Sequence, residues 1–296
     1  MKYCLGTVQF GLNYGIQENG QPQKEEVDEI LSYAIESGID ILDTASAYGE
    51  AEDVLGNYIR AYSKISKQVQ VVSKLRPDAF TGQPIEKWAD IALMNAKESL
   101  KRLGIDKFAV YLFHNASYIY DRNAVEALYE VKRQKLADRI GVSIYTPEEA
   151  MKALEYSEIS AIQIPYNLFD RRLDHCQFFS KAKEKDVLVF ARSSLLQGLL
   201  MMDPEHLPQK VFFAKDYIKR FLDICREYHL DPLQAAIGYV GCKKEIDYVV
   251  FGVDNIDQLK EYLSLKDVKF PSKMIVDMEQ AFDNVEERLV NPALWK

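Results

Sequence analysis

The chain has 296 residues and a formal net charge of -8 at pH 7. That length allows two domains, but a single α/β barrel also commonly reaches this size. The acidic balance argues against nucleic acid or an anionic membrane surface as a partner, because both attract basic proteins. No stretch approaches the roughly 20 apolar residues that a membrane-spanning helix needs. Residues 1–6 also lack the apolar run of a signal peptide.

The cysteines and histidines are scattered rather than grouped. The four cysteines are far apart and form no Cys-x-x-Cys pair, which argues against a zinc site or a disulfide framework. The four histidines also lack the spacing of metal ligands. Because unpaired thiols are typical of the cytosol, we expect a cytoplasmic protein without a bound metal.

Short apolar runs alternate with longer amphipathic runs along the whole chain. This alternation predicts βα units and therefore a parallel sheet. The expected strands are 3–7, 39–42, 69–73, 108–113, 138–143, 160–164, 187–191 and 247–251. The expected helices are about 24–37, 50–62, 85–103, 121–135, 147–155, 172–185, 213–228 and 255–264. Asp121 and Thr146-Pro147 are typical helix starts, and Gly104 suits a helix end.

Eight such repeats are the number that closes a parallel barrel. Two segments depart from the bare repeat. The connection 192–212 is long enough to cover the mouth of a barrel, and apolar residues between Met274 and Val285 predict a final helix. No Ser/Gly-rich linker divides the chain. We therefore expect one α/β domain over 1–296, a (β/α)8 TIM barrel with a long loop after strand 7 and a C-terminal helix.

Polar side chains stand at or just after the ends of three successive expected strands. Asp43 follows the first of these apolar runs, Lys74 follows the next and His114 follows the third. Tyr48 lies in the loop after the first of them. Active sites of such barrels lie at the carboxyl ends of the strands. We therefore expect these four side chains to share one pocket.

The four residue types suit the reduction of a carbonyl group. A tyrosine can protonate the developing alkoxide, but its ordinary pKa of about 10 makes it a reluctant acid. A nearby Lys74 would lower the pKa of Tyr48, and Asp43 would keep the buried lysine charged. His114 would donate a hydrogen bond to the carbonyl oxygen. Each residue alone has an ordinary explanation, such as capping or packing, but the four in this order predict a reductase.

The segments around these residues resemble the aldo-keto reductase family. The most specific match is Asp43-Thr44-Ala45-Ser46-Ala47-Tyr48-Gly49, followed by Ser73-Lys74 and Leu112-Phe113-His114. Residues 141–143, 163–167 and 197–200 follow in the family's order, and the resemblance covers about residues 3–264. It implies a barrel that binds NADP(H) or NAD(H) without a Rossmann domain. It also implies that Tyr48 is the general acid, that Lys74 and Asp43 tune it, and that His114 orients the carbonyl group.

The same resemblance implies a set of cofactor contacts. Ser143 and Gln163 match positions that hold the nicotinamide carboxamide, and Thr7 lies in the match to the first barrel strand. Arg192 stands where many members stack a tyrosine on the nicotinamide; it either stacks there or pairs with a carboxylate under the loop. The remaining expected contacts, in the segment that matches the adenosine site, are Gly252, Asn255 and Gln258.

The family's usual preference for NADPH is open to question in this chain. Members that prefer NADPH often have an arginine where Gln258 stands. Asp254 and Asp257 would repel a 2′-phosphate, and Lys260 could point elsewhere on its helix. Both NADP(H) and NAD(H) therefore remain candidates.

The expected substrate is a small-molecule carbonyl compound. Loops after the strands supply the expected contacts, which are Phe10, Tyr14, Asn115, Tyr118, Tyr166, Asn167 and the loop 192–212. Aromatic faces and amides suit a sugar or an aromatic aldehyde. We therefore expect an NAD(P)(H)-dependent oxidoreductase that reduces an aldehyde or ketone to an alcohol. Two alternatives are a non-catalytic cofactor-binding regulatory barrel and a lyase that uses Lys74 as a Schiff base. The sequence does not decide the oligomeric state.

Overall fold

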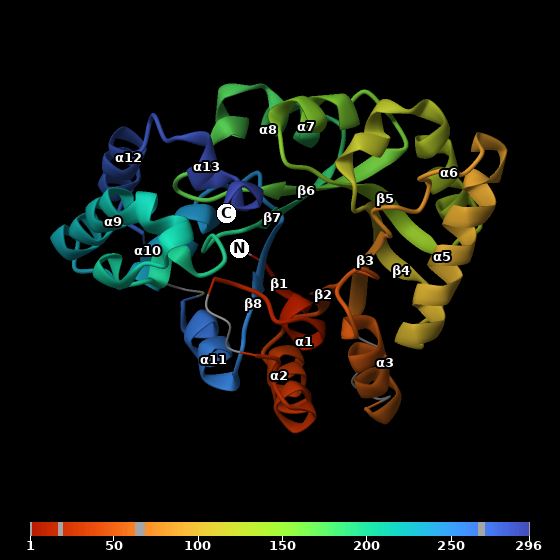
Figure 1. Ribbon diagram of the computed structural model, residues 1–296, viewed down its shortest axis with the longest axis horizontal. Coiled ribbons are helices and arrows are strands. Elements are labelled where there is room, and N and C mark those ends of the chain that lie inside the picture. The colour runs from red at the N-terminus through yellow and green to blue at the C-terminus, as the bar shows by residue number, and fades with distance from the viewer. Residues whose placement is uncertain (1, 17–19, 63–68, 266–269, 296) are drawn as a thin grey trace.

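The computed structural model describes residues 2–16, 20–62, 69–265 and 270–295. Eight parallel strands form a closed barrel in chain order, and β1 pairs with β8 to close it (Figure 1). The prediction of a (β/α)8 barrel is confirmed. The strands are β1 (Lys2–Gly6), β2 (Ile41–Asp43), β3 (Gln70–Leu75), β4 (Phe108–Phe113), β5 (Ala137–Ser143), β6 (Ile159–Pro165), β7 (Leu188–Arg192) and β8 (Tyr248–Gly252).

Helices alternate with the strands and surround the barrel. They are α1 (Val8–Gly11), α2 (Lys24–Glu36), α3 (Ala51–Ala61), α5 (Trp88–Leu103), α6 (Arg122–Arg133), α7 (Pro147–Ala153), α8 (Phe178–Glu184), α9 (Lys215–Glu227), α10 (Pro232–Gly241), α11 (Ile256–Ser264), α12 (Ser272–Ala281) and α13 (Glu287–Val290). The expected long connection after β7 and the C-terminal helix are both present. None of the described helices is long and apolar enough to cross a membrane.

Helix α10 was not predicted. Asp231 caps it by accepting hydrogen bonds from the N–H groups of Leu233 and Gln234, and Pro232 occupies its first turn. The helix is apolar on almost every side, so it lacks the amphipathic period that identified the other helices. In Figure 1, α9, α10, α12 and α13 gather on one side of the barrel.

The barrel interior has its own small core. Alternate residues of the strands fill it, namely Cys4, Ile41, Val72, Val110, Leu112, Ala161, Phe190 and Val250. The other face of each strand packs against the helices in a much larger core. Because side chains alternate across a strand, the residue two positions after the last interior residue of each strand also faces inward, at the mouth of the barrel.

Candidate active site

The strand period brings the candidate residues to the mouth of the barrel. Ile41, Val72 and Leu112 point into the interior. Asp43, Lys74 and His114 follow them by two positions, so they form the next inward-facing layer. The same rule places Gln163 after Ala161 and Arg192 after Phe190.

Lys74 and Asp43 form a buried ion pair in this layer. Lys74 is 0% exposed and Asp43 is 4% exposed. The Lys74 Nζ lies 2.8 Å from each Asp43 carboxylate oxygen and 2.9 Å from the carbonyl oxygen of Thr44. Burial alone would lower the pKa of Lys74, but the Asp43 carboxylate and Tyr48 outweigh it and raise that pKa. Lys74 is therefore a charged ammonium whose donors are all engaged.

Tyr48 lies against both Lys74 and His114. The Lys74 Nζ is 4.8 Å from the centre of the Tyr48 ring, and the His114 ring meets it edge-on at 5.6 Å between centres. Burial raises the pKa of Tyr48, and the Lys74 charge only partly opposes this rise. The expected lowering by Lys74 is present, but it is smaller than the effect of burial. The phenol is therefore protonated at neutral pH, as a proton donor must be.

His114 is held in its neutral form. Burial, the Lys74 ammonium and the Arg192 guanidinium together lower the pKa of His114 to about 4. Its Nδ1 is buried and has no hydrogen-bond partner among the described residues. A neutral imidazole carries one N–H, which is the group that a carbonyl oxygen needs.

Three of the expected cofactor residues are hydrogen-bonded to Asp43, either directly or through another residue. The Gln163 Nε2 donates to an Asp43 carboxylate oxygen over 2.8 Å, and the Ser143 hydroxyl donates to the Gln163 Oε1 over 3.3 Å. The Thr7 hydroxyl donates to the backbone carbonyl of Asp43 over 3.0 Å. These bonds hold β1, β2, β5 and β6 in one polar layer.

Arg192 contacts no carboxylate among the described residues. Its guanidinium donates to the carbonyl oxygen of Ile144 over 2.9 Å and to the Ser193 hydroxyl over 3.1 Å. It also lies 4.6 Å from the centre of the Tyr145 ring. The alternative prediction was that Arg192 pairs with a carboxylate under the loop. No described residue supplies such a carboxylate.

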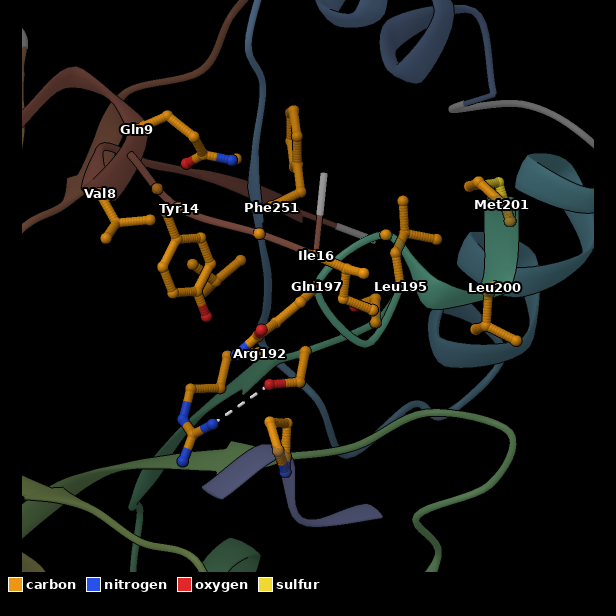
Figure 2. Close-up of a pocket in the computed structure, with 18 of the residues that line it drawn as sticks. Val8, Gln9, Tyr14, Ile16, Arg192, Leu195, Gln197, Leu200, Met201 and Phe251 are labelled. Carbon is orange, nitrogen blue, oxygen red and sulfur yellow. Dashed lines mark hydrogen bonds between the residues drawn. The ribbon is translucent and has the colours of Figure 1, made fainter. Parts of the chain in front are cut away.

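A cavity of about 1090 Å³ opens above this layer. In Figure 2, Val8 and Gln9 lie on one side of it, and Leu195, Leu200 and Met201 lie on the other. Tyr48, His114, Ser143, Gln163 and Arg192 line it. The other expected residues among its lining are Thr7, Tyr14, Asp43, Gly252 and Gln258.

Asn255 caps α11 instead of lining this cavity. Its side chain accepts from the N–H of Gln258 over 2.9 Å. At Gly252, a Cβ atom would collide with the Gln9 side-chain oxygen. Glycine at this position thus leaves room for the Gln9 side chain.

Most of the expected substrate contacts lie outside the cavity lining. Phe10 is buried in the core, and the Tyr166 hydroxyl donates to Asp174 over 2.9 Å. Asn167 is buried and its side-chain oxygen accepts from two backbone N–H groups of its own turn. Asn115 donates to the Pro77 carbonyl and caps a short 3-10 turn.

Tyr118, another aromatic residue that was expected to contact substrate, also lies outside the cavity lining. Its hydroxyl accepts from the N–H of Phe80 over 3.1 Å, and its ring packs against Phe113. Of the aromatic and amide residues expected to touch substrate, only Tyr14 is brought to the cavity. Figure 2 shows Tyr14 extending into the same part of the cavity as Arg192 and Gln197.

The loop after β7 supplies many further lining residues. Ser193, Leu196 and Gln197 have positive φ angles of 64°, 48° and 56°, which are uncommon for residues other than glycine. The hydroxyl of Ser194 is buried without a hydrogen-bond partner among the described residues. The sequence predicted that the connection 192–212 covers the mouth of the barrel. No local pattern predicted which of its individual residues line the cavity.

The barrel and its converging polar layer define a known class of protein. The aldo/keto reductase family matches the chain over residues 2–283. The chain therefore belongs to the aldo/keto reductase family of oxidoreductases, as its sequence motifs predicted.

Individual relatives are distant but similar over most of their length. An aldo-keto reductase of Gibberella moniliformis is 23% identical over 279 residues, which are 88% of this chain and 84% of that protein. The NADH-specific methylglyoxal reductase of Escherichia coli is 22% identical over 288 residues, which span 87% of each protein. An aldo-keto reductase from Bacillus halodurans, solved in its holo form, has a TM-score of 0.78 at 21% identity, covering 98% of this chain and 95% of its own. This structural likeness supports the fold.

Proposed function

We propose that this protein reduces an aldehyde or ketone to an alcohol with NAD(P)H, and that Tyr48 is the general acid. The observation that carries the proposal is the convergence of four side chains beneath one cavity. They are Asp43, Tyr48, Lys74 and His114, with a charged lysine, a protonated phenol and a neutral imidazole. This combination suits protonation of an oxygen that gains negative charge.

The cavity lining fits a nicotinamide cofactor. Besides its large volume, it offers buried polar atoms that lack partners among the described residues, including the Ser194 hydroxyl and the Gln9 side-chain oxygen. When bound, the nicotinamide supplies the hydride. Ser143 and Gln163 would hold its carboxamide, and Arg192 would lie beside its ring. The other proposed contacts are Thr7, Gly252, Asn255 and Gln258.

Each residue of the polar layer has a defined task in this proposal. The neutral His114 donates a hydrogen bond to the substrate oxygen and orients it. Tyr48 transfers its hydroxyl proton to that oxygen as negative charge develops. The Lys74 ammonium stabilises the resulting phenolate, and Asp43 keeps Lys74 charged and in place.

The substrate is proposed to be a small carbonyl compound, with sugars and aromatic aldehydes among the candidates. The relative named as an NADH-specific methylglyoxal reductase adds small oxo-aldehydes to these candidates and supports NAD(H) as one possible cofactor. Tyr14 is the proposed aromatic contact. The cytoplasmic location and the single-domain organisation stay predictions.

The two alternative functions differ in how well they suit the site. A Schiff-base lyase needs an uncharged lysine amine, whereas Lys74 is charged and its three donors are engaged. A regulatory barrel would use the same cofactor site without turnover. It requires a separate test.

Replacing Tyr48 by phenylalanine tests the proposal. The Tyr48→Phe variant lacks the proton donor, so we expect turnover of a reactive aldehyde to fall by about 10²–10⁴-fold. Cofactor affinity, followed by fluorescence titration, should change little because the ring remains. The exposed Tyr120 gives a matched control, and Tyr120→Phe should keep full activity.

Two results would contradict the proposal. Undiminished turnover by Tyr48→Phe would remove Tyr48 as the acid. Cofactor binding by the unmodified protein, without turnover on a broad panel of carbonyl compounds, would favour the regulatory barrel.

A further inference from the structure

The polar layer at the barrel mouth carries a positive charge that no described carboxylate neutralises. Lys74 and Asp43 cancel each other, because the Lys74 Nζ lies 2.8 Å from the Asp43 carboxylate. Arg192 is the second cation of this layer and the sole lysine or arginine among the described lining residues of the cavity. Its guanidinium forms no ion pair within the described chain and donates to the Ile144 carbonyl oxygen and the Ser193 hydroxyl instead. The layer therefore presents one uncompensated positive charge to the cavity.

Local contacts hold the Arg192 side chain at the wall of the cavity. It is partly buried at the end of β7, two positions after the interior residue Phe190. Besides its two hydrogen bonds, the guanidinium lies 4.6 Å from the centre of the Tyr145 ring, which also lines the cavity. Figure 2 shows Arg192 and Tyr14 facing the same part of the cavity. The charge therefore has a defined place in the site.

This charge acts across the mouth of the barrel on the residue proposed to orient the substrate. Strands β4, which ends just before His114, and β7 are not neighbours in the closed barrel, so His114 and Arg192 stand on different sides of the mouth. Burial is the largest cause of the low pKa of His114, and the charges of Lys74 and Arg192 add to it. Burial also raises the pKa of Tyr14, and the Arg192 charge opposes this rise. The Arg192 charge therefore acts on both His114 and Tyr14.

A nicotinamide ring that serves this site must lie in the same space. Hydride transfer needs the ring carbon and the carbonyl carbon in near contact, and the carbonyl oxygen is proposed to contact Tyr48 and His114. The hydride takes both bonding electrons to the carbonyl carbon while the Tyr48 proton goes to the oxygen, so the ring is neutral in NAD(P)H and positively charged in NAD(P)+. Two positive charges held near each other in a partly buried site repel each other. Arg192 therefore disfavours the oxidised ring.

We propose that Arg192 makes this site bind the reduced cofactor in preference to the oxidised one. The inference rests on the proposed reductase function and adds a selectivity for the redox state of its cofactor. With this preference, the oxidised product leaves readily and competes weakly with NAD(P)H for the site. The protein then acts as a reductase even where the oxidised cofactor is in excess.

Calorimetric titration of the full chain with matched cofactor pairs tests this preference. The pairs are NADH with NAD+ and NADPH with NADP+. We expect the reduced member to bind at least about tenfold more tightly than its oxidised partner, which corresponds to a rise of about 30 mV in the reduction potential of the bound cofactor. Equal or tighter binding of the oxidised members would overturn the inference and leave the reductase proposal intact. Failure of all four to bind to folded protein would overturn both.

Removing the charge tests the role of Arg192 itself. Arg192→Gln keeps a hydrogen-bond donor without the charge, and its ratio of oxidised to reduced dissociation constants should fall about threefold to tenfold, because the repulsion is lost. Arg192→Lys keeps the charge and should retain most of the original ratio. Arg133→Gln, at an exposed position at the end of α6 outside the cavity lining, is the control and should leave the ratio unchanged. An unchanged ratio in Arg192→Gln would refute the inference.

ADP-ribose separates an effect on the nicotinamide from an effect on the diphosphate, because it lacks the nicotinamide ring. If Arg192 acts on the ring, Arg192→Gln should bind ADP-ribose about as well as the unmodified protein does, while its ratio for the complete cofactors falls. If Arg192 instead pairs with the diphosphate, Arg192→Gln should weaken the binding of ADP-ribose, NADH and NAD+ by the same factor. That uniform loss would also overturn the inference.

Discussion

His114 is surrounded by features that all oppose its charged form. Its ring is largely buried, and two permanent cations, Lys74 and Arg192, act on it. No described group accepts a hydrogen bond from its Nδ1. The same environment that keeps His114 a neutral donor therefore makes its protonation costly. This cost links the chemistry of one residue to the stability of the whole protein at acidic pH.

We expect His114 to contribute a specific acid sensitivity. An unfolded histidine has a pKa of about 6.5, whereas the pKa of folded His114 is lowered to about 4. The unfolded chain therefore takes up this proton first as the pH falls. The corresponding stability is complete above about pH 6.5 and is lost toward about pH 4, by about 3 kcal/mol at most because the ring is partly exposed.

Urea unfolding across this pH range checks the expectation. The free energy of unfolding should fall more steeply with acid in the unmodified protein than in His114→Gln. The exposed His175 provides the control, and His175→Gln should keep the original slope. Equal slopes in the unmodified protein and His114→Gln would contradict the argument.

At the scale of elements, one buried carboxylate fastens the segments that carry Tyr48 and Lys74. Glu52 lies in the first turn of α3, just after the loop of Tyr48. It accepts from the Ser73 hydroxyl over 2.7 Å and from the Arg102 Nε over 2.8 Å. Ser73 directly precedes Lys74 on β3, and Arg102 belongs to α5. Glu52 thus joins three elements behind the site.

We expect Glu52→Ala to be strongly destabilising. The change leaves the buried Ser73 hydroxyl and the partly buried Arg102 without their acceptor, and leaving such buried groups unsatisfied costs about 1–3 kcal/mol each. Glu52→Gln should cost less, because it keeps one acceptor oxygen. Chemical denaturation measures both values. The exposed Glu29 on α2 is the control, and a loss for Glu52→Ala as small as for Glu29→Ala would refute the proposed fastening.

The sequence predicted the helix ends that are set by residues close together in the chain. Thr146 caps α7 with a capping box, Asp121 caps α6, and Gly104 ends α5 at a φ of 69°. Each cap involves residues within a few positions of one another. The apolar α10 has no amphipathic period, and the sequence did not distinguish it from a loop between the expected helix 213–228 and the expected strand 247–251.

In the candidate site, too, the residues placed by local patterns could be predicted, and those placed by contacts between distant segments could not. The positions of Asp43, Lys74 and His114 follow from the period of two along each strand, so the sequence could anticipate them. The orientation of Tyr166 depends on Asp174, and that of Asn167 depends on Ser193 in the next strand's loop. Contacts between separate segments decide these orientations, and no spacing within one segment encodes them.

At the scale of the whole molecule, the cavity draws on both ends of the chain. Gly6 and Thr7 line it from the end of β1, and residues 291–293 line it from beyond α13. The connection after β7 completes the wall. Because β1 and β8 are neighbours in the closed barrel, a ligand in this cavity touches segments from the beginning, the late part and the end of the chain. Its binding should therefore stabilise the entire fold.

We accordingly expect thermal unfolding to respond to cofactor. A ligand that binds only the folded state, at 100 times its dissociation constant, adds about 2.7 kcal/mol. For a chain of this size, the midpoint Tm should rise by about 4–8 °C. Scanning calorimetry with and without NADH measures the shift, and Tyr48→Phe should show it too, because that variant keeps the cavity. If the dinucleotide left Tm unchanged at saturating concentration, it would not occupy a cavity that joins these segments.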